Sequence, residues 1–339
     1  MTFPAITDFT NSRDYAKAVD TKYADDQELQ PGEVYVFGND TRFASANYNV
    51  PLTNFAVGGW ANSGLEQELT AYVGAPVLVN RRFNYKVWAN AEALKSETDD
   101  LRAIGAEFQE VRRGTSEVNT QTAQRGLIMV LDKEELASGV VTEQGAVQYL
   151  TQRLQLNQIR RASALLVAAA NDTGRAWYTT GTPLDPDLNL QTALNSYQAA
   201  TGIDANTAIF GRFAWVGRLT MLRSLATAAG FAGAALTTEA ELASYLGLEQ
   251  VYRASATYQS ATATKTVVGT SKVLLYYKSM TGMQYDPSNI KYFYSPAASG
   301  GRLEAFRYEE GSSKVIVGVR HNELLAITYS CGIQSITVP

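Results

Sequence analysis

A long polar stretch interrupts the apolar pattern in the first half of the chain. A short apolar run at residues 75–79 is followed by roughly 45 residues of mainly charged and polar sequence before the next apolar run, at 126–131. A polar stretch of this length has few apolar side chains with which to form a hydrophobic core of its own, so it needs another surface to pack against. Any fold of this chain must therefore hold the segment outside its central core.

The polar stretch itself is predicted to form a long hairpin. Apolar and polar side chains alternate over residues 83–88, which indicates a strand. A charged, helix-compatible tip follows at 91–103, and residues 106–111 are extended again. An isolated two-stranded ribbon is marginally stable in water, and its unpaired edges favour contact with another chain. The pattern therefore indicates a building block of an assembly.

One helix is unusually long. The spacing of Val147, Leu150 and Leu154 predicts a helix over residues 143–170, which at 1.5 Å per residue is about 40 Å long. Thr142 is the expected N-cap, and residues 171–174 are expected to end the helix with Gly174 in the left-handed conformation. A helix of this length is expected to span a domain and to pack on a sheet.

The rest of the chain is predicted to mix helices and strands. Glycines 202 and 247 are expected to end two of the helices, and the chain is expected to close as a three-stranded antiparallel meander. The expected helices cover 64–72, 189–200, 212–227 and 238–246, and the expected strands cover 207–210, 250–258, 272–277, 301–309, 314–321 and 324–330.

The composition argues against several classes of function. The net charge is −4, whereas a generic nucleic-acid binder shows a basic patch. The single histidine, His321, is interpreted as a strand-end or edge residue, and the single cysteine, Cys331, as a small buried hydrophobe. The adjacent acid pairs at 25–26, 99–100, 134–135 and 309–310 are expected to be solvated. No catalytic motif, cofactor site or metal site is therefore predicted, and the chain is not expected to be an enzyme.

The first residues and the hydropathy of the chain indicate where the protein is made and located. The first residues lack the basic and apolar regions of a signal peptide, and no apolar run is long enough to span a membrane. The sequence thus predicts a soluble protein made inside the cell. Residues 1–50 are acidic and contain scattered aromatic residues, which favours an extended arm that packs on another surface. The alternative is a partly disordered tail.

The order of these parts resembles that of the major capsid proteins of tailed bacteriophages with the Hong Kong 97-type shell fold. The stretches that carry the resemblance are 75–79 (APVLV), 101–107 (LRAIGAE), 160–166 (RRASALL), 184–193 (LDPDLNLQTA), 205–211 (ANTAIFG), 239–251 (EAELASYLGLEQV), 272–277 (KVLLYY) and 327–333 (ITYSCGI). Together they cover about residues 70–339. Their order and spacing are more specific than any one stretch.

The resemblance implies an α+β fold with an N-terminal arm, an extended β-hairpin loop, a peripheral domain with a long spine helix, and an axial α/β domain. The implied divisions are 1–73 for the arm and a short helix, 74–131 for the extended loop, 132–180 for the spine-helix region, 181–300 mainly for the axial domain, and 301–339 for C-terminal strands returning to the sheet. Covalent cross-linking, known in some members, is not carried over, because the partner asparagine and the acid cannot be aligned. A fused scaffolding segment is expected to be absent.

The implied function is an icosahedral shell of pentamers and hexamers around double-stranded DNA, assembled in the host cytoplasm and located in the virion. The implied partners are other copies of the chain, a separate scaffolding protein, a portal and a decoration protein, with no sequence-specific DNA binding, no membrane and no cofactor. Candidate contacts between subunits are the aromatic residues and arginines of the hairpin: Arg81, Arg82, Phe83, Tyr85, Trp88, Arg112 and Arg113. For the aromatic residues, packing within the subunit is an equal alternative, and for the arginines the equal alternative is a solvated charged face.

Two other functions stay open. An encapsulin-type nanocompartment would use the same fold to hold cargo protein. A soluble α/β hydrolase using the acid pairs would instead be a compact monomer with a cleft.

Overall fold

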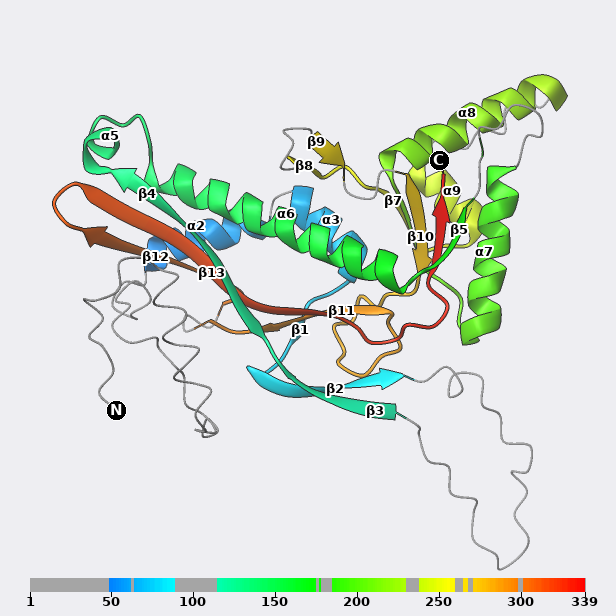
Figure 1. Ribbon diagram of the computed structural model, residues 1–339, viewed down its shortest axis with the longest axis horizontal. Coiled ribbons are helices and arrows are strands. Elements are labelled where there is room, and N and C mark those ends of the chain that lie inside the picture. Colours follow the sequence, from blue (N-terminus) through cyan, green and yellow to red (C-terminus); the bar gives the residue numbers. More distant parts are fainter. Residues whose placement is uncertain are drawn as a thin grey trace, which may run out of the picture. The chain divides into compact units, whose positions relative to one another are not determined.

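The computed structural model describes residues 49–61, 64–88, 115–174, 177, 185–229, 238–259, 265–267, 271–297 and 301–338, all within the unit Ser45–Pro339 (Figure 1). Its helices are α2 (Val50–Ala61), α3 (Gly64–Val73), α5 (Lys133–Ala137), α6 (Glu143–Ala169), α7 (Pro186–Thr201), α8 (Arg212–Ala229) and α9 (Glu239–Leu246). Its strands are β1 (Val77–Leu78), β2 (Arg82–Trp88), β3 (Thr115–Gln121), β4 (Ala123–Asp132), β5 (Asn171–Gly174), β6 (Thr207–Phe210), β7 (Gln250–Arg253), β8 (Thr257–Gln259), β9 (Lys265–Val267), β10 (Lys272–Tyr276), β11 (Ile290–Ser295), β12 (Leu303–Glu310), β13 (Lys314–Ile327) and β14 (Gln334–Thr337).

The first sheet is built around one long strand, β13. Its first part pairs with β12 and β4 at the same residues, so these two strands lie on opposite edges of β13. Its last part pairs with β11, which also carries β1. The expected three-stranded meander is wrong, because Asn322 and Glu323 continue the strand and do not form a turn. These two polar residues are held in the sheet by pairing with both β4 and β11.

Helix α6 covers one face of this sheet together with α2 (Figure 1). Val147, Leu150 and Leu154 are buried against inward residues of β12 and β13, which confirms the predicted face. The predicted N-cap is also confirmed, since Thr142 Oγ1 accepts a hydrogen bond from the Gly145 N–H at 3.1 Å. Packing of this face, more than helix propensity, stabilises such a helix.

The predicted end of the long helix is wrong. The helix stops at Ala169, and Ala170 is already extended, with φ −79° and ψ 144°. Residues Asn171–Gly174 then form β5, which pairs in parallel with β14. The local sequence reads as a helix stop, but pairing with a strand near the other end of the chain decides its conformation.

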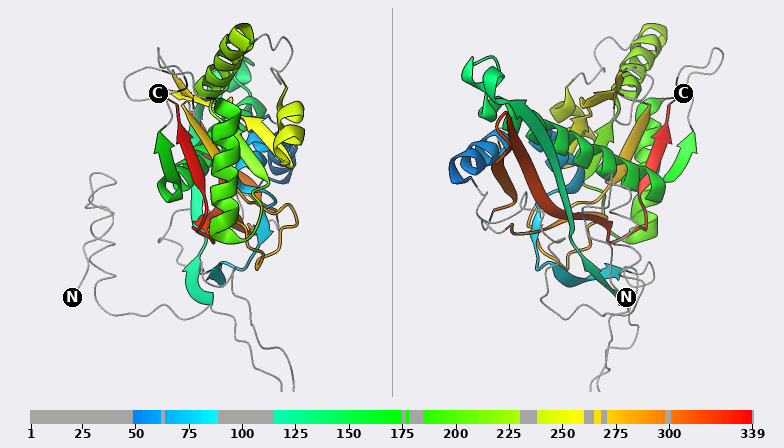
Figure 2. Two further views of the ribbon diagram at one scale, coloured as in Figure 1. Left: turned by 90° about the vertical axis from the view of Figure 1, so that its right-hand side faces the viewer. Right: turned by 60° about the vertical axis from the view of Figure 1, so that its left-hand side comes forward.

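The second sheet has the strand order β5-β14-β10-β6-β7 and is covered on both faces. Ala208 and Phe210 face a core formed with α7, α8 and α9, whereas Ile209 faces a core formed with α3 and the end of α6. Gly202 and Gly247 end α7 and α9 at φ 69° and 70°, as predicted. Figure 2 shows β14 beside β5 and β10 in this sheet. Within the described residues, no helix combines the length and apolar character needed to cross a membrane.

Candidate intersubunit site

A two-stranded ribbon leaves the first sheet beside β4. Strands β2 and β3 pair antiparallel from Arg82↔Gln121 to Trp88↔Thr115. The outgoing strand was predicted, whereas the expected return strand at 106–111 lies outside the described residues. The described return strand is Thr115–Gln121, which sequence reasoning missed because Val118 is its one apolar residue. Val118 stands opposite Tyr85, so the partner strand supplies the apolar character.

Aromatic residues anchor the base of the ribbon within the subunit. The rings of Phe83 and Tyr85 lie with centroids 4.9 and 5.5 Å from that of Phe293 on β11. Burial raises the pKa of Tyr85. Trp88 is half-buried, and its backbone N–H donates to Thr328 O at 3.0 Å. Packing of Phe83 and Tyr85 within the subunit is one of the two expectations, and any role of these residues between subunits stays a prediction.

Hydrogen bonds join the ribbon to two other segments. Thr122, the residue between β3 and β4, donates its N–H to Arg81 O at 2.9 Å, and its hydroxyl lies 2.8 Å from that of Ser295. Gln284, in the connection between β10 and β11, donates to Asn84 O at 2.6 Å. The base of the ribbon is therefore fixed in direction, whatever its tip contacts.

The predicted charged contacts fall into two groups. Arg81 and Arg82 are exposed, and neither has a carboxylate within ion-pair distance among the residues that the structure describes. Arg112 and Arg113 lie outside the described residues. Lys86, which was not among the predicted contacts, lies 3.9 Å from Glu117 and 5.5 Å from the Tyr285 ring centroid. Pairing of Arg81 and Arg82 with a carboxylate of another chain stays a prediction.

A buried charge cluster lies where β4, β13 and α6 meet. Glu323 forms ion pairs with Arg161 and with Arg125 (3.1 Å), and His321 Nε2 lies 3.3 Å from its Oε2. Burial tends to raise the pKa of Glu323, but the hydrogen bond and charge of His321 and the charge of Arg161 lower it to about 2. His321 is 1% exposed and lies within β13, so its interpretation as a strand-end or edge residue is wrong. The cluster draws on three distant parts of the sequence, so no local motif signals it.

A second buried polar cluster joins the two sheets. The Asn289 side chain donates to Tyr329 O at 2.7 Å and Cys331 O at 3.0 Å, and it accepts from Tyr277 N at 2.7 Å and the Tyr197 hydroxyl at 2.8 Å. These bonds tie together the β10–β11 and β13–β14 connections and α7. The Asn289 amide therefore helps to hold the two sheets together, with its oxygen and nitrogen both paired.

A buried lysine attaches α3 to the second sheet. Lys278 Nζ donates to Thr70 O at 2.9 Å, to Ala71 O at 2.5 Å and to Gln250 Oε1 at 2.7 Å. Burial lowers the pKa of Lys278 to about 7, and the nearby Glu249 acts in the opposite direction. The two carbonyls belong to the last turn of α3, where a cation is favourable.

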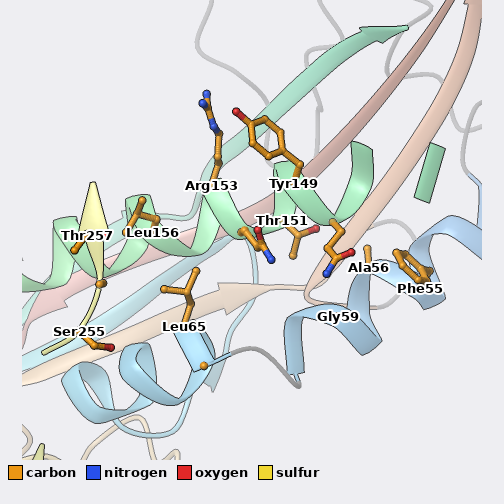
Figure 3. Close-up of a pocket in the computed structure, with 14 residues that line it drawn as sticks. Phe55, Ala56, Gly59, Leu65, Tyr149, Thr151, Arg153, Leu156, Ser255 and Thr257 are labelled. Atoms are coloured by element: carbon orange, nitrogen blue, oxygen red, sulfur yellow. The ribbon is translucent and has the colours of Figure 1, made fainter. Parts of the chain in front are cut away.

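A groove of about 690 Å³ lies between α2, α3 and α6 (Figure 3). Among the described residues that line it, Arg153 is the one charged side chain, and none is a histidine, cysteine, aspartate or glutamate. Across the described residues, no group of three or more such side chains is placed to hold a metal ion. Glu134 and Glu135 are exposed on α5, Glu309 pairs with Lys133 at 2.6 Å, and Cys331 is buried. The groove therefore offers a binding surface rather than a nucleophile and base.

Comparison with solved structures identifies the fold. No family model matches the sequence, and no curated protein matches it. A phage-related protein from Bordetella bronchiseptica RB50 superposes with a TM-score of 0.64 at 16% identity, covering 86% of this chain and 96% of its own. The chain has the Hong Kong 97-type shell fold. The chain is also similar to a virus-like particle protein from Pyrococcus furiosus, with a TM-score of 0.50 at 10% identity, covering 84% of this chain and 97% of that one. A protein of Microbacterium phage Oxtober96 superposes with a TM-score of 0.50 at 14% identity, covering 80% of this chain and 90% of its own. In this Hong Kong 97-type fold, α6 is the long helix.

Proposed function

We propose that the chain is a major capsid protein that assembles into the pentamers and hexamers of an icosahedral phage head around double-stranded DNA. The observation that carries this proposal is the fold, which extends over 96% of a phage-related protein. Its role is structural and not enzymatic, and its place is the virion, after assembly in the host cytoplasm. A scaffolding protein, a portal and a decoration protein are the further partners that this function requires or permits.

The ribbon supplies the physical reason for assembly. Its base is anchored within the subunit by Phe83 and Tyr85 on Phe293. Contacts made by such a segment on a neighbour add to an obligate interface, which typically buries about 2,000 Å² or more in total. Arg81 and Arg82 supply charge at its base for carboxylates of a neighbouring copy.

Particle size is the decisive measurement. The purified full-length chain should elute as megadalton material, and negative-stain electron microscopy should show closed shells. A monomer at all concentrations, with no shells in the micrographs, would reject the capsid function and favour a hydrolase. Replacement of Arg112 and Arg113 by glutamate tests the charged contacts separately, because unchanged shell yield would exclude them.

A nanocompartment shell is the second candidate, because the same fold can enclose protein. Particles recovered from producing cells distinguish the two functions. DNA absorbance without a stoichiometric second protein supports the phage head. A cargo protein identified by mass spectrometry in DNA-free particles supports the compartment.

A further inference from the structure

The exposed side of α6 carries positive charge without any acid. After Glu143 at its start, the helix contains no aspartate or glutamate. Arg153 and Arg160 are exposed and are seven residues apart, so they lie on one face, about 10 Å apart along the axis. The amides of Gln148 and Gln152 are exposed on the neighbouring surface of the helix. In a chain with a net charge of −4, this is a local reversal of sign.

Both arginines are stacked on tyrosine rings. The guanidinium carbon of Arg153 lies 4.6 Å from the Tyr149 ring centroid, and that of Arg160 lies 3.8 Å from the Tyr258 centroid. Figure 3 shows Arg153 and Tyr149 side by side on α6. Stacking holds the guanidinium plane and leaves its N–H edge directed to solvent.

Neither arginine is used inside the subunit as an ion pair. Among the described residues, Arg153 and Arg160 have no carboxylate within 4.0 Å, which is the ion-pair distance. In contrast, Arg161, on the same helix, pairs with Glu323, and Arg307 pairs with Glu143 at 2.7 Å. The two stacked arginines are therefore open to an anion that the described part of the subunit does not supply.

Neutral hydrogen-bonding groups extend the arginine face into the adjoining groove. The groove lining includes Gln148, Gln152 and Thr257 as well as Arg153, whereas the hydroxyl of Ser255, which also lines it, already donates to Oε2 of the buried Glu68 at 2.8 Å. Arginine, glutamine and threonine side chains are among the groups that contact nucleic-acid phosphates. Among the described residues that line the groove there is no carboxylate, and the nearby Glu68 is buried and hydrogen-bonded to Ser255 and Ala256.

We propose that this face of α6 contacts the phosphate backbone of the enclosed DNA, which also places α6 on the inner wall of the shell. The proposal rests on the capsid function proposed above. An extended polyanion fits better than a single acidic peptide, because the charge continues past the groove to Arg160. The contact is independent of sequence, and with two cations per subunit it is weak enough for DNA to move during packaging.

Cross-linking in DNA-filled particles tests the contact directly. Particles of the wild-type chain are irradiated with ultraviolet light, digested with nuclease and protease, and searched by mass spectrometry for peptides that carry nucleotides. Adducts on Tyr149 or Tyr258 are expected. Adducts confined to other parts of the chain, or a protein cross-linked to the α6 face instead, would overturn the proposal while leaving the capsid function intact.

A charge-reversal variant gives an independent measurement. Arg153→Glu with Arg160→Glu should assemble like the wild type but release DNA at a lower temperature and a lower salt concentration. Arg212→Glu, which changes an exposed arginine at the start of α8, is the matched control and should leave release unchanged. Identical release from the double variant and the wild type contradicts the proposal. If wild-type particles contain no DNA, the capsid function itself fails, and this inference fails with it.

Discussion

At the scale of single residues, Glu323 has the largest predicted effect on stability. Its carboxylate is 2% exposed and carries ion pairs to α6 and β4. Because its pKa is lowered from 4.5 to about 2 in the folded chain, the folded state binds fewer protons than the unfolded state between these values. Its stabilisation is therefore complete above about pH 4.5 and is lost as pH falls toward 2.

This linkage gives a testable pH dependence. Between pH 5 and pH 2 the wild-type subunit should lose about 3 kcal/mol of unfolding free energy that Glu323→Gln does not lose. Urea unfolding of the unassembled subunit at several pH values measures this difference. Glu135→Gln removes an exposed carboxylate and should follow the wild-type curve. Parallel curves for wild type and Glu323→Gln would exclude the assigned role.

Gly318 is required by a close aromatic contact across two strands. A Cβ atom at this position would lie 2.1 Å from Cζ of Phe306 on β12. Gly318→Ala should therefore destabilise the subunit by about 1–3 kcal/mol, as measured by urea unfolding. Gly174→Ala is the control, because no atom lies within 4 Å of its Cβ position.

A second substitution tests whether the loss of stability comes from the clash with the Phe306 ring or from the change of backbone residue in β13. Phe306→Leu added to Gly318→Ala should recover part of the lost stability, since it removes the clashing ring atoms. Equal destabilisation in the single and double variants would argue against the contact.

At the scale of elements, the ribbon is expected to open before the sheet that carries it. Phe83 is half-buried and packs on Phe293, so Phe83→Ala should speed hydrogen exchange of the amides in β2 and β3 by roughly tenfold, equivalent to about 1.4 kcal/mol of local opening. Amides of β13 should be unaffected. Asn84→Ala, on the exposed face of the same strand, should leave ribbon exchange unchanged.

Elements with their own local signals could be predicted from sequence. The N-caps Thr142 and Thr238 and the glycine caps at Gly202 and Gly247 agree with the structure, because capping depends on a few neighbouring residues. Strands β5 and β14 were not predicted. Each exists because it pairs with a distant strand, and polar residues such as Asn171 give no local sign of that pairing.

The candidate site divides in the same way. The aromatic alternation that contains Phe83 and Tyr85 indicates the outgoing strand of the ribbon, but not that Phe293 is their partner. Burial of Glu323 and His321 was not predictable. The adjacent polar residues Asn322 and Glu323 resemble a turn until the partners of Glu323 on α6 and β4 are known.

At the scale of the whole molecule, the ribbon tip can be removed without disturbing its base. Trp88 and Thr115 are directly paired, so residues 89–114 can be replaced by an Asn-Gly turn that closes a short hairpin. The variant should keep wild-type circular dichroism and thermal unfolding but form no shells in electron microscopy. Normal shells would show that the tip is not needed for assembly.

The path of the chain from β3 into β4 determines how the subunit bears force. Thr122 alone separates the two strands, and β4 is paired along its whole length with β13. Tension on the ribbon therefore acts along the strand axis and loads this ladder in shear, so that many hydrogen bonds must break together. A pull across the sheet would instead unzip them one at a time. A single subunit stretched in an optical trap should accordingly yield at a much higher force along the ribbon than across it.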